Sequence, residues 1–459
     1  MRATTVLVAI TALCAGCEYL GGWAPAASVT RTDVDRDRPC AWLPDEVAQT
    51  RLRRSAVGDK VRRLLVPALQ SAELDAWLLV ERASQRDPMF DSLGLTDPGD
   101  KAALFVNAGS ALPRAFGFGS SPATLAQLTA SGLFERVQPL SPASVQDVLA
   151  EFRPGRIGID YSGRVALADG IATGTRQFAA WLVGREYAGT FRSAETAAVT
   201  FRAGHTPDEI DLARQAARCA VEIADRALDG GAIEAGRTTG AELSWRILHD
   251  IHAARLDTSA PPHVSAIKLD DHAHLNWPWL GPNTDTVIAT GDLVHLDFDV
   301  RYAGVASTLQ RTAYVLKRWE SSVPADLHRA SETLGQVRAG LAPMFRPGVT
   351  GATIANDAAQ WVKQNRVAVE LVAHPIGSIA VDVGTLAQSD HPIGPYDPAG
   401  ALTERPLQDQ DLQALGFRVT VGLDNGQSLT LSASDDGVVG FGGLDFLAPP
   451  VGILVVPRA

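Results

Sequence analysis

The chain is poor in cysteine and in positive charge. Only 4 of its 459 residues are cysteines, and two of these, Cys14 and Cys17, lie among the first residues. Cys40 and Cys219 remain for the body of the protein, and two isolated cysteines exclude a scaffold built on a disulfide framework. We expect either two structural thiols or one bridge. The net charge of -11 argues against nucleic acid as a partner, because binding it needs clustered positive charge.

Two further signals are missing from the sequence. No nucleotide-binding glycine pattern follows any expected strand. Residues 116–121 are glycine-rich, but they lack the basic residue and the following helix of a phosphate-binding loop, so we expect an ordinary loop there. The arginines at positions 51, 53, 54, 62 and 63 are interpreted as the solvated face of a helix.

The first residues are typical of an export signal. Met1 and Arg2 give a positive start, residues 4–15 form an apolar run too short to span a bilayer, and Gly16 precedes Cys17. We predict a signal peptide over residues 1–17, with lipidation of Cys17 as in bacterial lipoproteins, and a tether over residues 18–45. The protein would then be anchored in the bacterial cell envelope. Cleavage near residues 24–27 would instead leave a periplasmic or secreted protein.

Residues 46–202 alternate helical and strand patterns. Hydrophobic residues make up 46% of the chain, enough to bury real cores, and 459 residues predict two or three domains. Short apolar runs at 76–80, 102–106 and 156–160 indicate buried strands, and helices are expected at 51–66, 144–152 and 170–182. Pro67 is a plausible end for the first helix. This order predicts an α/β domain.

Residues 203–459 begin with two well-marked helices. Thr206-Pro-Asp-Glu209 and Thr239-Gly-Ala-Glu242 both read as capping boxes, in which a threonine hydroxyl and a glutamate satisfy the first free N–H groups. We expect helices from these points to Leu228 and to His252. A strand pair around Asp297 and residue 313 follows, then helices near 325–344 and 353–364. The last hundred residues read mainly as strands and loops.

Four stretches of this second half together resemble the creatinase/aminopeptidase P family. They are the Thr206 helix start, the hairpin over residues 291–314, Arg346-Pro-Gly, and His374-Pro-Ile-Gly. The resemblance covers residues 50–459 and implies an α/β N-terminal creatinase-like domain over 46–202 and an α+β pita-bread domain over 203–459. It also implies a dinuclear metallohydrolase acting on peptides with an Xaa-Pro bond. Family members often form dimers, which makes a homodimer plausible.

Five metal ligands are implied by the resemblance, and four of them are absent here. Asp297 matches the first aspartate, but Thr308 stands at the second aspartate position. The region of the histidine ligand holds no histidine and places Ala387 near it. Neither the strand over residues 417–421 nor the strand over residues 428–434 contains a glutamate. Asp435 and Asp436 read as a turn. A lone carboxylate does not hold two dications, so no cofactor is expected.

Other polar residues form a candidate replacement site. His295, Asp297 and Asp299 alternate, so on a strand they face one side, and with His391 or Asp382 they suggest a single-cation site. Otherwise Asp299 pairs with Arg301 or Arg311. The resemblance also suggests a proton-shuttling His263 or His274 and a substrate-binding His374 in the old catalytic cleft.

These observations leave three functions open. The first is an exported relative that has lost dinuclear catalysis and keeps its cleft for a peptide or a partner protein. The second is a metal-free hydrolase in the manner of creatinase, with acid–base chemistry on His263 or His274 and His374. The third is an active Xaa-Pro aminopeptidase or dipeptidase that uses a divalent metal, Mn, Co or Zn.

Overall fold

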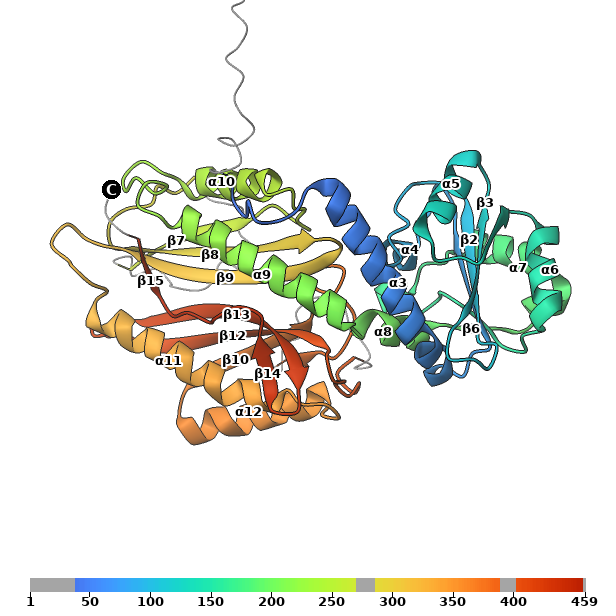
Figure 1. The fold of residues 1–459 in the computed structure, drawn as a ribbon. Coiled ribbons are helices and arrows are strands. Elements are labelled where there is room, and N and C mark those ends of the chain that lie inside the picture. Colours follow the sequence, from blue (N-terminus) through green and yellow to red (C-terminus); the bar gives the residue numbers. More distant parts are fainter. Residues whose placement is uncertain (1–37, 270–284, 389–401, 457–459) are drawn as a thin grey trace, which may run out of the picture.

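A computed structural model describes residues 38–269, 285–388 and 402–456. The N-terminal elements form a six-stranded sheet of order β4-β3-β2-β1-β5-β6, with helices on both of its faces (Figure 1). The elements are α3 (Glu46–Ser71), β1 (Ala76–Glu81), α4 (Pro88–Ser92), β2 (Lys101–Val106), β3 (Arg114–Gly119), α5 (Pro122–Ser131), β4 (Arg136–Pro139), α6 (Pro142–Phe152), β5 (Ile157–Ile159), α7 (Thr173–Ala188), β6 (Phe191–Ser193) and α8 (Glu195–Ala203).

Two details of this region differ from the sequence prediction. Pro67 does not end the first helix, because α3 continues to Ser71 while Leu65, Ala68 and Leu69 are buried against the sheet. This burial outweighs the one helical hydrogen bond that a proline removes. The glycine-rich residues 116–121 are also not simply a loop. Most of them belong to β3, which pairs with both β2 and β4.

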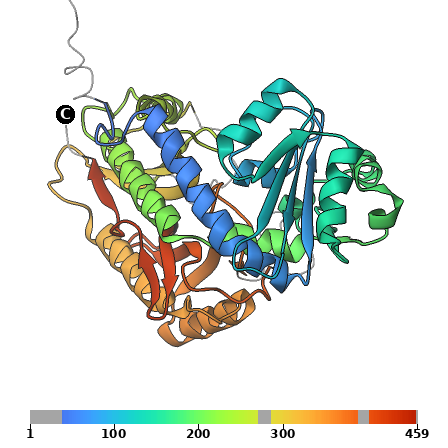
Figure 2. The ribbon, with the colours of Figure 1, turned by 45° about the vertical axis from the view of Figure 1, so that its right-hand side comes forward.

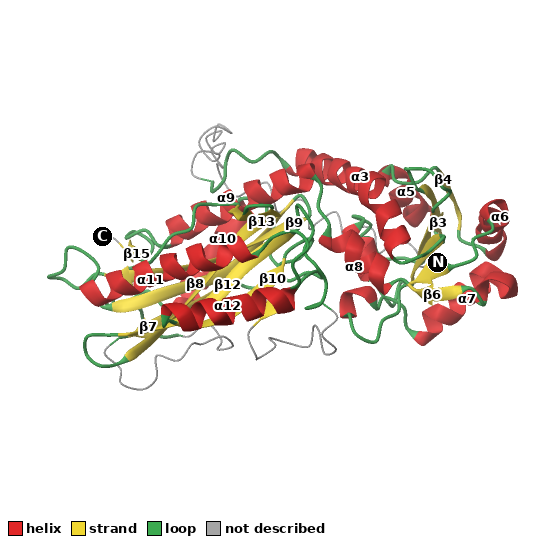
Figure 3. Cartoon of the chain, turned by 90° about the horizontal axis from the view of Figure 1, so that it is seen from below, coloured by secondary structure: helices red, strands yellow, loops and turns green. Residues whose placement is uncertain are grey.

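The C-terminal elements form two sheets, of order β15-β9-β8-β7 and β11-β10-β12-β13-β14. Helices α9 and α10 pack on the first sheet, and α11 and α12 cover the second in the view from below (Figure 3). The elements are α9 (Pro207–Ala227), α10 (Gly240–Ala253), β7 (His263–Lys268), β8 (Asp292–Tyr302), β9 (Val305–Val315), α11 (Ala325–Leu341), α12 (Gly351–Asn365), β10 (Ala368–Pro375), β11 (Ala387–Gln388), β12 (Leu412–Gly422), β13 (Ser428–Gly440), β14 (Gly443–Phe446) and β15 (Leu454–Val456).

Both predicted capping boxes are confirmed. The Thr206 hydroxyl accepts from the backbone N–H of Glu209, and the Glu209 carboxylate accepts from that of Thr206. The same reciprocal pair joins Thr239 and Glu242 at the start of α10. The alanine-rich face of α9 then packs on β8 and β9, the two strands of the predicted hairpin. The locally encoded start of α9 therefore helps to fix where this helix meets the hairpin.

Cys40 and Cys219 form a disulfide, so the bridged alternative is the correct one. The bond joins the segment before α3 to the middle of α9, and Figure 2 shows these two helices side by side. Residues 38–45, assigned above to a tether, are thus attached to the body, and Leu43 among them is buried. The predicted signal peptide and Cys17 lie outside the described residues. Within the described ranges no helix is long and apolar enough to cross a membrane.

Candidate functional site

A cavity of about 260 Å³ opens between the two C-terminal sheets. It is lined by residues of β7, β8, β9, β10 and β13 and of the loops next to them. The lining residues are Ala260, Pro261, His263, Asp297, Phe298, Asp299, Thr308, Gln310, His374, Ala380, Val381 and Ser434. The hairpin residues singled out from the sequence therefore face one cavity together with His263 and His374.

Asp297 is held by a glutamine from the neighbouring strand. Antiparallel pairing of β8 with β9 sets Asp297 opposite Gln310, and pairing with β7 sets it opposite His263. The Gln310 amide donates to Asp297 Oδ2 at 3.1 Å and accepts from the Ser432 hydroxyl at 2.7 Å. Burial raises the pKa of Asp297 to about 6, although the Gln310 hydrogen bond opposes this shift.

Thr308 is hydrogen-bonded to an aspartate from the second sheet. Its hydroxyl donates to Asp436 Oδ1 at 2.6 Å and its backbone N–H to Oδ2 at 2.6 Å, while Ser307 donates to Oδ2 at 2.8 Å. The prediction that Asp435 and Asp436 form a turn is wrong, because both are buried inside β13. Sheet pairing on both sides of the strand overrides their turn preference. Burial raises the pKa of Asp436 to about 7.

Asp299 is satisfied without a basic partner. It accepts from the Thr258 hydroxyl at 3.1 Å and from the backbone N–H of Ser259 at 2.9 Å. The expected pairing with Arg301 or Arg311 is wrong. Arg301 pairs with Asp257 at 3.2 Å, because the chain after α10 returns beside the end of β8 and brings that carboxylate with it. Arg311 instead approaches Asp435, at 3.4 Å.

His295 does not belong to the cavity wall. It shares the strand face of Asp297, as alternation predicts, but its Nδ1 lies 2.9 Å from the Thr312 hydroxyl in the buried interior. Burial lowers the pKa of His295 to about 3, so the ring is neutral at pH 7. Asp382, also considered for a replacement site, is instead bound by Arg202 of α8 at 2.7 Å. The predicted replacement site is therefore not assembled from the described residues, and His391 lies outside them.

The two described candidate histidines meet at the cavity. His263 begins β7 and His374 lies near the end of β10. Burial lowers the pKa of His374, whose Nδ1 lies 3.2 Å from its neighbour's carbonyl, Pro375 O. A neutral imidazole in this setting can accept or donate a hydrogen bond but carries no charge. The roles suggested for both residues stay predictions, and His274 lies outside the described residues.

The strands expected to supply glutamates present small residues. Ser434 is the residue of β13 that lines the cavity, and the β12 residue directly opposite it is Gly416. Ala387 is buried in β11 and does not line the cavity. Sequence inspection missed Gln310 and Ser434 as site residues, and it assigned Asp436 to a turn. Gln310 had one available signal, since it lies two positions after Thr308 and so on the same face of a strand.

The described residues do not fit a dinuclear metal centre. Among them, no group of three or more histidine, cysteine, aspartate or glutamate side chains is placed to hold a metal ion. Two dications close together need several anionic ligands, and here Asp297, Asp299 and the neighbouring Asp436 already accept hydrogen bonds from neutral donors. We therefore derive no metal-dependent step from this geometry.

Part of the chain matches a known family model. Residues 211–414 match the model of metallopeptidase family M24, which is consistent with the resemblance to the creatinase/aminopeptidase P family. No curated protein matches the chain.

Solved structures of similar fold cover most of the molecule. An X-Pro aminopeptidase from Thermotoga maritima MSB8 covers 85% of this chain and 100% of its own, with TM-score 0.62 and 14% identity. An Xaa-Pro dipeptidase from Bacillus anthracis covers 87% and 100%, with TM-score 0.59 and 16% identity. A prolidase from Pyrococcus furiosus covers 84% and 99%, with TM-score 0.55 and 14% identity. At such identities these matches establish the fold alone, and the predicted fold class is confirmed.

Proposed function

We propose that this protein is a relative of the Xaa-Pro peptidases that has lost dinuclear metal catalysis and keeps the C-terminal cavity for binding peptides. One observation carries the proposal: Asp297, Asp299 and Asp436 are each hydrogen-bonded to separate neutral donors. Carboxylates that share a dication would have to converge on it. Thr308 at the second aspartate position and Ser434 on β13 add no further charge.

The cavity chemistry favours the amino terminus of a peptide as the bound group. Asp297 and Asp299 bring two carboxylates, while none of the described lining residues is a lysine or an arginine. The rest of the wall is mainly apolar, with Pro261, Phe298 and Val381. A cationic amine followed by an apolar side chain satisfies both parts of such a site.

Metal analysis and peptide hydrolysis test the loss of catalysis. The purified protein is incubated with Mn²⁺, Co²⁺ or Zn²⁺, freed of excess metal, and assayed on Xaa-Pro dipeptides. We expect substoichiometric metal and no turnover above that of an Asp297→Asn control. Near two equivalents of bound metal, with turnover that the control loses, would instead support the active peptidase.

Peptide binding is tested separately by calorimetry. A free-amine Xaa-Pro peptide should bind about tenfold more tightly than its N-acetylated form, because the charge-assisted bond to Asp297 is lost. Asp297→Asn should remove this preference. Equal affinity for both peptides would contradict an amine-binding cavity. It would not bear on the proposed loss of metal catalysis.

A metal-free hydrolase is the second candidate function. It is favoured by His263 and His374, which line the same cavity as Asp297 and could exchange a proton with a bound substrate. Creatinase-type amidine substrates and Xaa-Pro peptides are the substrates to assay. Turnover without added metal that His374→Ala abolishes would establish this function, and absence of turnover would exclude it for those substrates.

Export and assembly remain part of the proposal. We propose that the chain is exported and that Cys17 carries a lipid, with a homodimer as the expected assembly. Membrane fractionation of the wild type and of Cys17→Ser distinguishes a lipid anchor from a periplasmic or secreted protein. Light scattering on the purified chain measures the number of subunits.

A further inference from the structure

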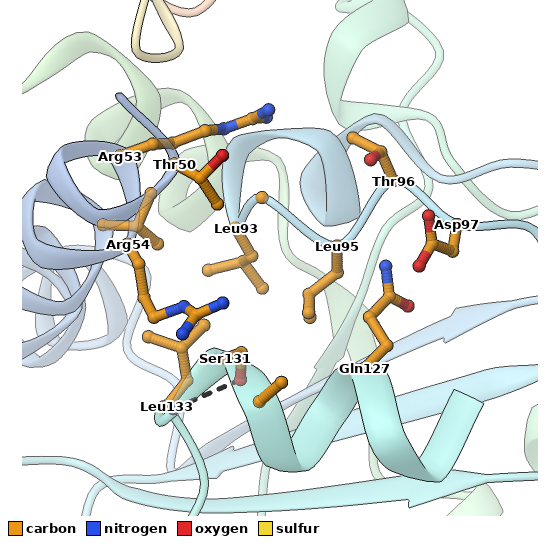
Figure 4. A pocket seen from close by; sticks show the side chains of 13 residues that line it. Thr50, Arg53, Arg54, Leu93, Leu95, Thr96, Asp97, Gln127, Ser131 and Leu133 are labelled. Carbon is orange, nitrogen blue, oxygen red and sulfur yellow. Dashed lines mark hydrogen bonds between the residues drawn. The ribbon is translucent and has the colours of Figure 1, made fainter. Parts of the chain in front are cut away.

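A second cavity, of about 320 Å³, lies in the N-terminal half, away from the site described above (Figure 4). Helix α3 forms one wall, the loop after α4 the second, and the end of α5 the third. This volume lies within the range that small-molecule sites occupy. The side chains that face it come from Thr50, Arg53, Arg54, Val57, Leu93, Leu95, Thr96, Asp97, Gln127, Ser131 and Leu133.

The loop that forms the second wall is firmly attached. Leu95 N donates to Phe90 O at 2.8 Å, and the Arg86 guanidinium donates to Thr96 O at 3.1 Å. The buried Lys101 ammonium donates to Asp97 O at 2.7 Å. Because these bonds fix the loop before any ligand arrives, little ordering entropy opposes binding.

The base of the cavity is apolar. Leu93 and Leu95 are buried, and Figure 4 shows both side chains turned into the space between α3 and α5. Val57 and Leu133 are half-buried at the same place. A ligand with a branched aliphatic side chain could cover these groups from water.

Opposite charges face each other across this base. Figure 4 shows the Arg54 guanidinium turned into the cavity from α3, and the Asp97 carboxylate beside Gln127 on the far wall. Within the described part of the chain neither group has an ion-pair partner. Arg53, by contrast, donates to Asp91 O at 3.2 Å. Arg54 and Asp97 are thus the charges available to a ligand.

We propose that this cavity binds a short apolar peptide with both termini free. Arg54 receives the carboxylate, Asp97 receives the ammonium group, and the aliphatic side chain covers Leu93, Leu95 and Leu133. Arginine suits a carboxylate because its planar fork can donate two parallel hydrogen bonds. The site is independent of the C-terminal cavity and of the function proposed for it.

Calorimetry with the dipeptide Ala-Leu tests the proposal on the full chain. The chain carries Asp297→Asn, which weakens the binding of a free amine in the C-terminal cavity. We expect the C-terminal amide and the N-acetyl form of Ala-Leu each to bind about fivefold to tenfold more weakly than the free dipeptide. Arg54→Gln should weaken binding of the free dipeptide by the same factor and leave binding of the amide unchanged. Asp97→Asn should likewise weaken binding of the free dipeptide and leave binding of the N-acetyl form unchanged.

Matched controls separate this site from general charge effects. Arg51→Gln removes an exposed arginine from the same helix, and Asp147→Asn removes an exposed aspartate from α6; neither residue lines the cavity. Both controls should bind Ala-Leu as before. The proposal is overturned if Ala-Leu does not bind at millimolar concentration, or if Arg54→Gln binds as tightly as the Arg51→Gln control. Circular dichroism confirms that each variant is folded.

Discussion

At the junction between the two halves of the molecule, buried carboxylates form ion pairs with arginine or lysine. Around the C-terminal cavity, buried carboxylates accept hydrogen bonds from neutral donors only. At the junction Arg202 binds Asp382 at 2.7 Å, and Lys60 binds Glu209 at 3.0 Å. Around the cavity Asp297 and Asp436 accept from an amide, from hydroxyls and from a backbone N–H. Even neighbours on β13 differ, since Asp435 binds Arg338 at 2.7 Å.

This difference shows what each set of charges can do. A buried ion pair holds two elements in one register and leaves no charge for a ligand. Arg202 ties α8 to the loop that carries Ala380 and Val381, and so positions part of the cavity wall. A buried carboxylate with neutral donors alone keeps part of its negative charge for an incoming cation, at a cost in stability when it ionises.

The largest expected effect comes from breaking the junction. Arg202→Met leaves the Asp382 charge buried without its cation, so the free energy of unfolding at pH 7 should fall by about 3–5 kcal/mol. Urea denaturation measures this. The double variant Arg202→Met/Asp382→Leu should recover part of the loss, because no unpaired charge remains. A loss below about 1 kcal/mol in the single variant would show that the junction pair contributes as little to stability as an exposed ion pair.

Asp297 in the cavity and Asp436 buried behind Thr308 should give the protein a characteristic pH dependence. Asp297 and Asp436 have pKa values raised to about 6 and about 7, from 3.8. Between pH 4 and 7 the folded state therefore binds more protons than the unfolded state, so stability falls as pH rises through this window. Between pH 4 and 8 the free energy of unfolding should fall by about 3 kcal/mol less in Asp436→Asn than in the wild type, as measured by urea denaturation. An unchanged pH profile would contradict a pKa of Asp436 that burial raises despite its hydrogen bonds to Ser307 and Thr308.

Restoring the second aspartate should harm the protein. In Thr308→Asp the new carboxylate would face Asp436, where the native hydroxyl now donates at 2.6 Å. We expect a loss of about 2 kcal/mol, larger at pH 8 than at pH 5, because like charges meet in a buried site. Thermal denaturation with and without Mn²⁺ is the measurement. Full recovery of stability on adding Mn²⁺ would reveal a metal site after all.

The smallest effect is expected at Asp299. Asp299→Asn keeps the size of the side chain but changes into a donor one of the two oxygens that accept from the Thr258 hydroxyl and the Ser259 N–H. The loss of stability should be about 1 kcal/mol, with a weaker preference of the cavity for a free-amine peptide. Denaturation and calorimetry test the two parts. A gain in stability would show that the charge of Asp299 is the more costly feature.

Local patterns were enough for much of this fold. Capping boxes located α9 and α10, apolar runs located β1, β2 and β5, and the hairpin around Asp297 indicated the resemblance that the M24 family match supports. These signals lie within a few neighbouring residues, so they can be recognised without knowing the tertiary structure. That Thr308 stands where the resemblance implies an aspartate could be predicted from the sequence for the same reason, since this needs only a count along one hairpin.

The tertiary structure decided which groups each polar side chain contacts. Asp435 and Asp436 lie in a strand rather than a turn because β12 and β14 pair with that strand, and Asp436 meets Thr308 only through packing between the sheets. Likewise the donors to Asp299 come from a loop forty residues away in sequence, and the Cys40–Cys219 bond spans a separation of 179. The sequence by itself determined which side chains carry charge and which helices begin where. Long-range pairing decided which donor each charge receives, because burial and hydrogen bonding depend on elements distant in the chain.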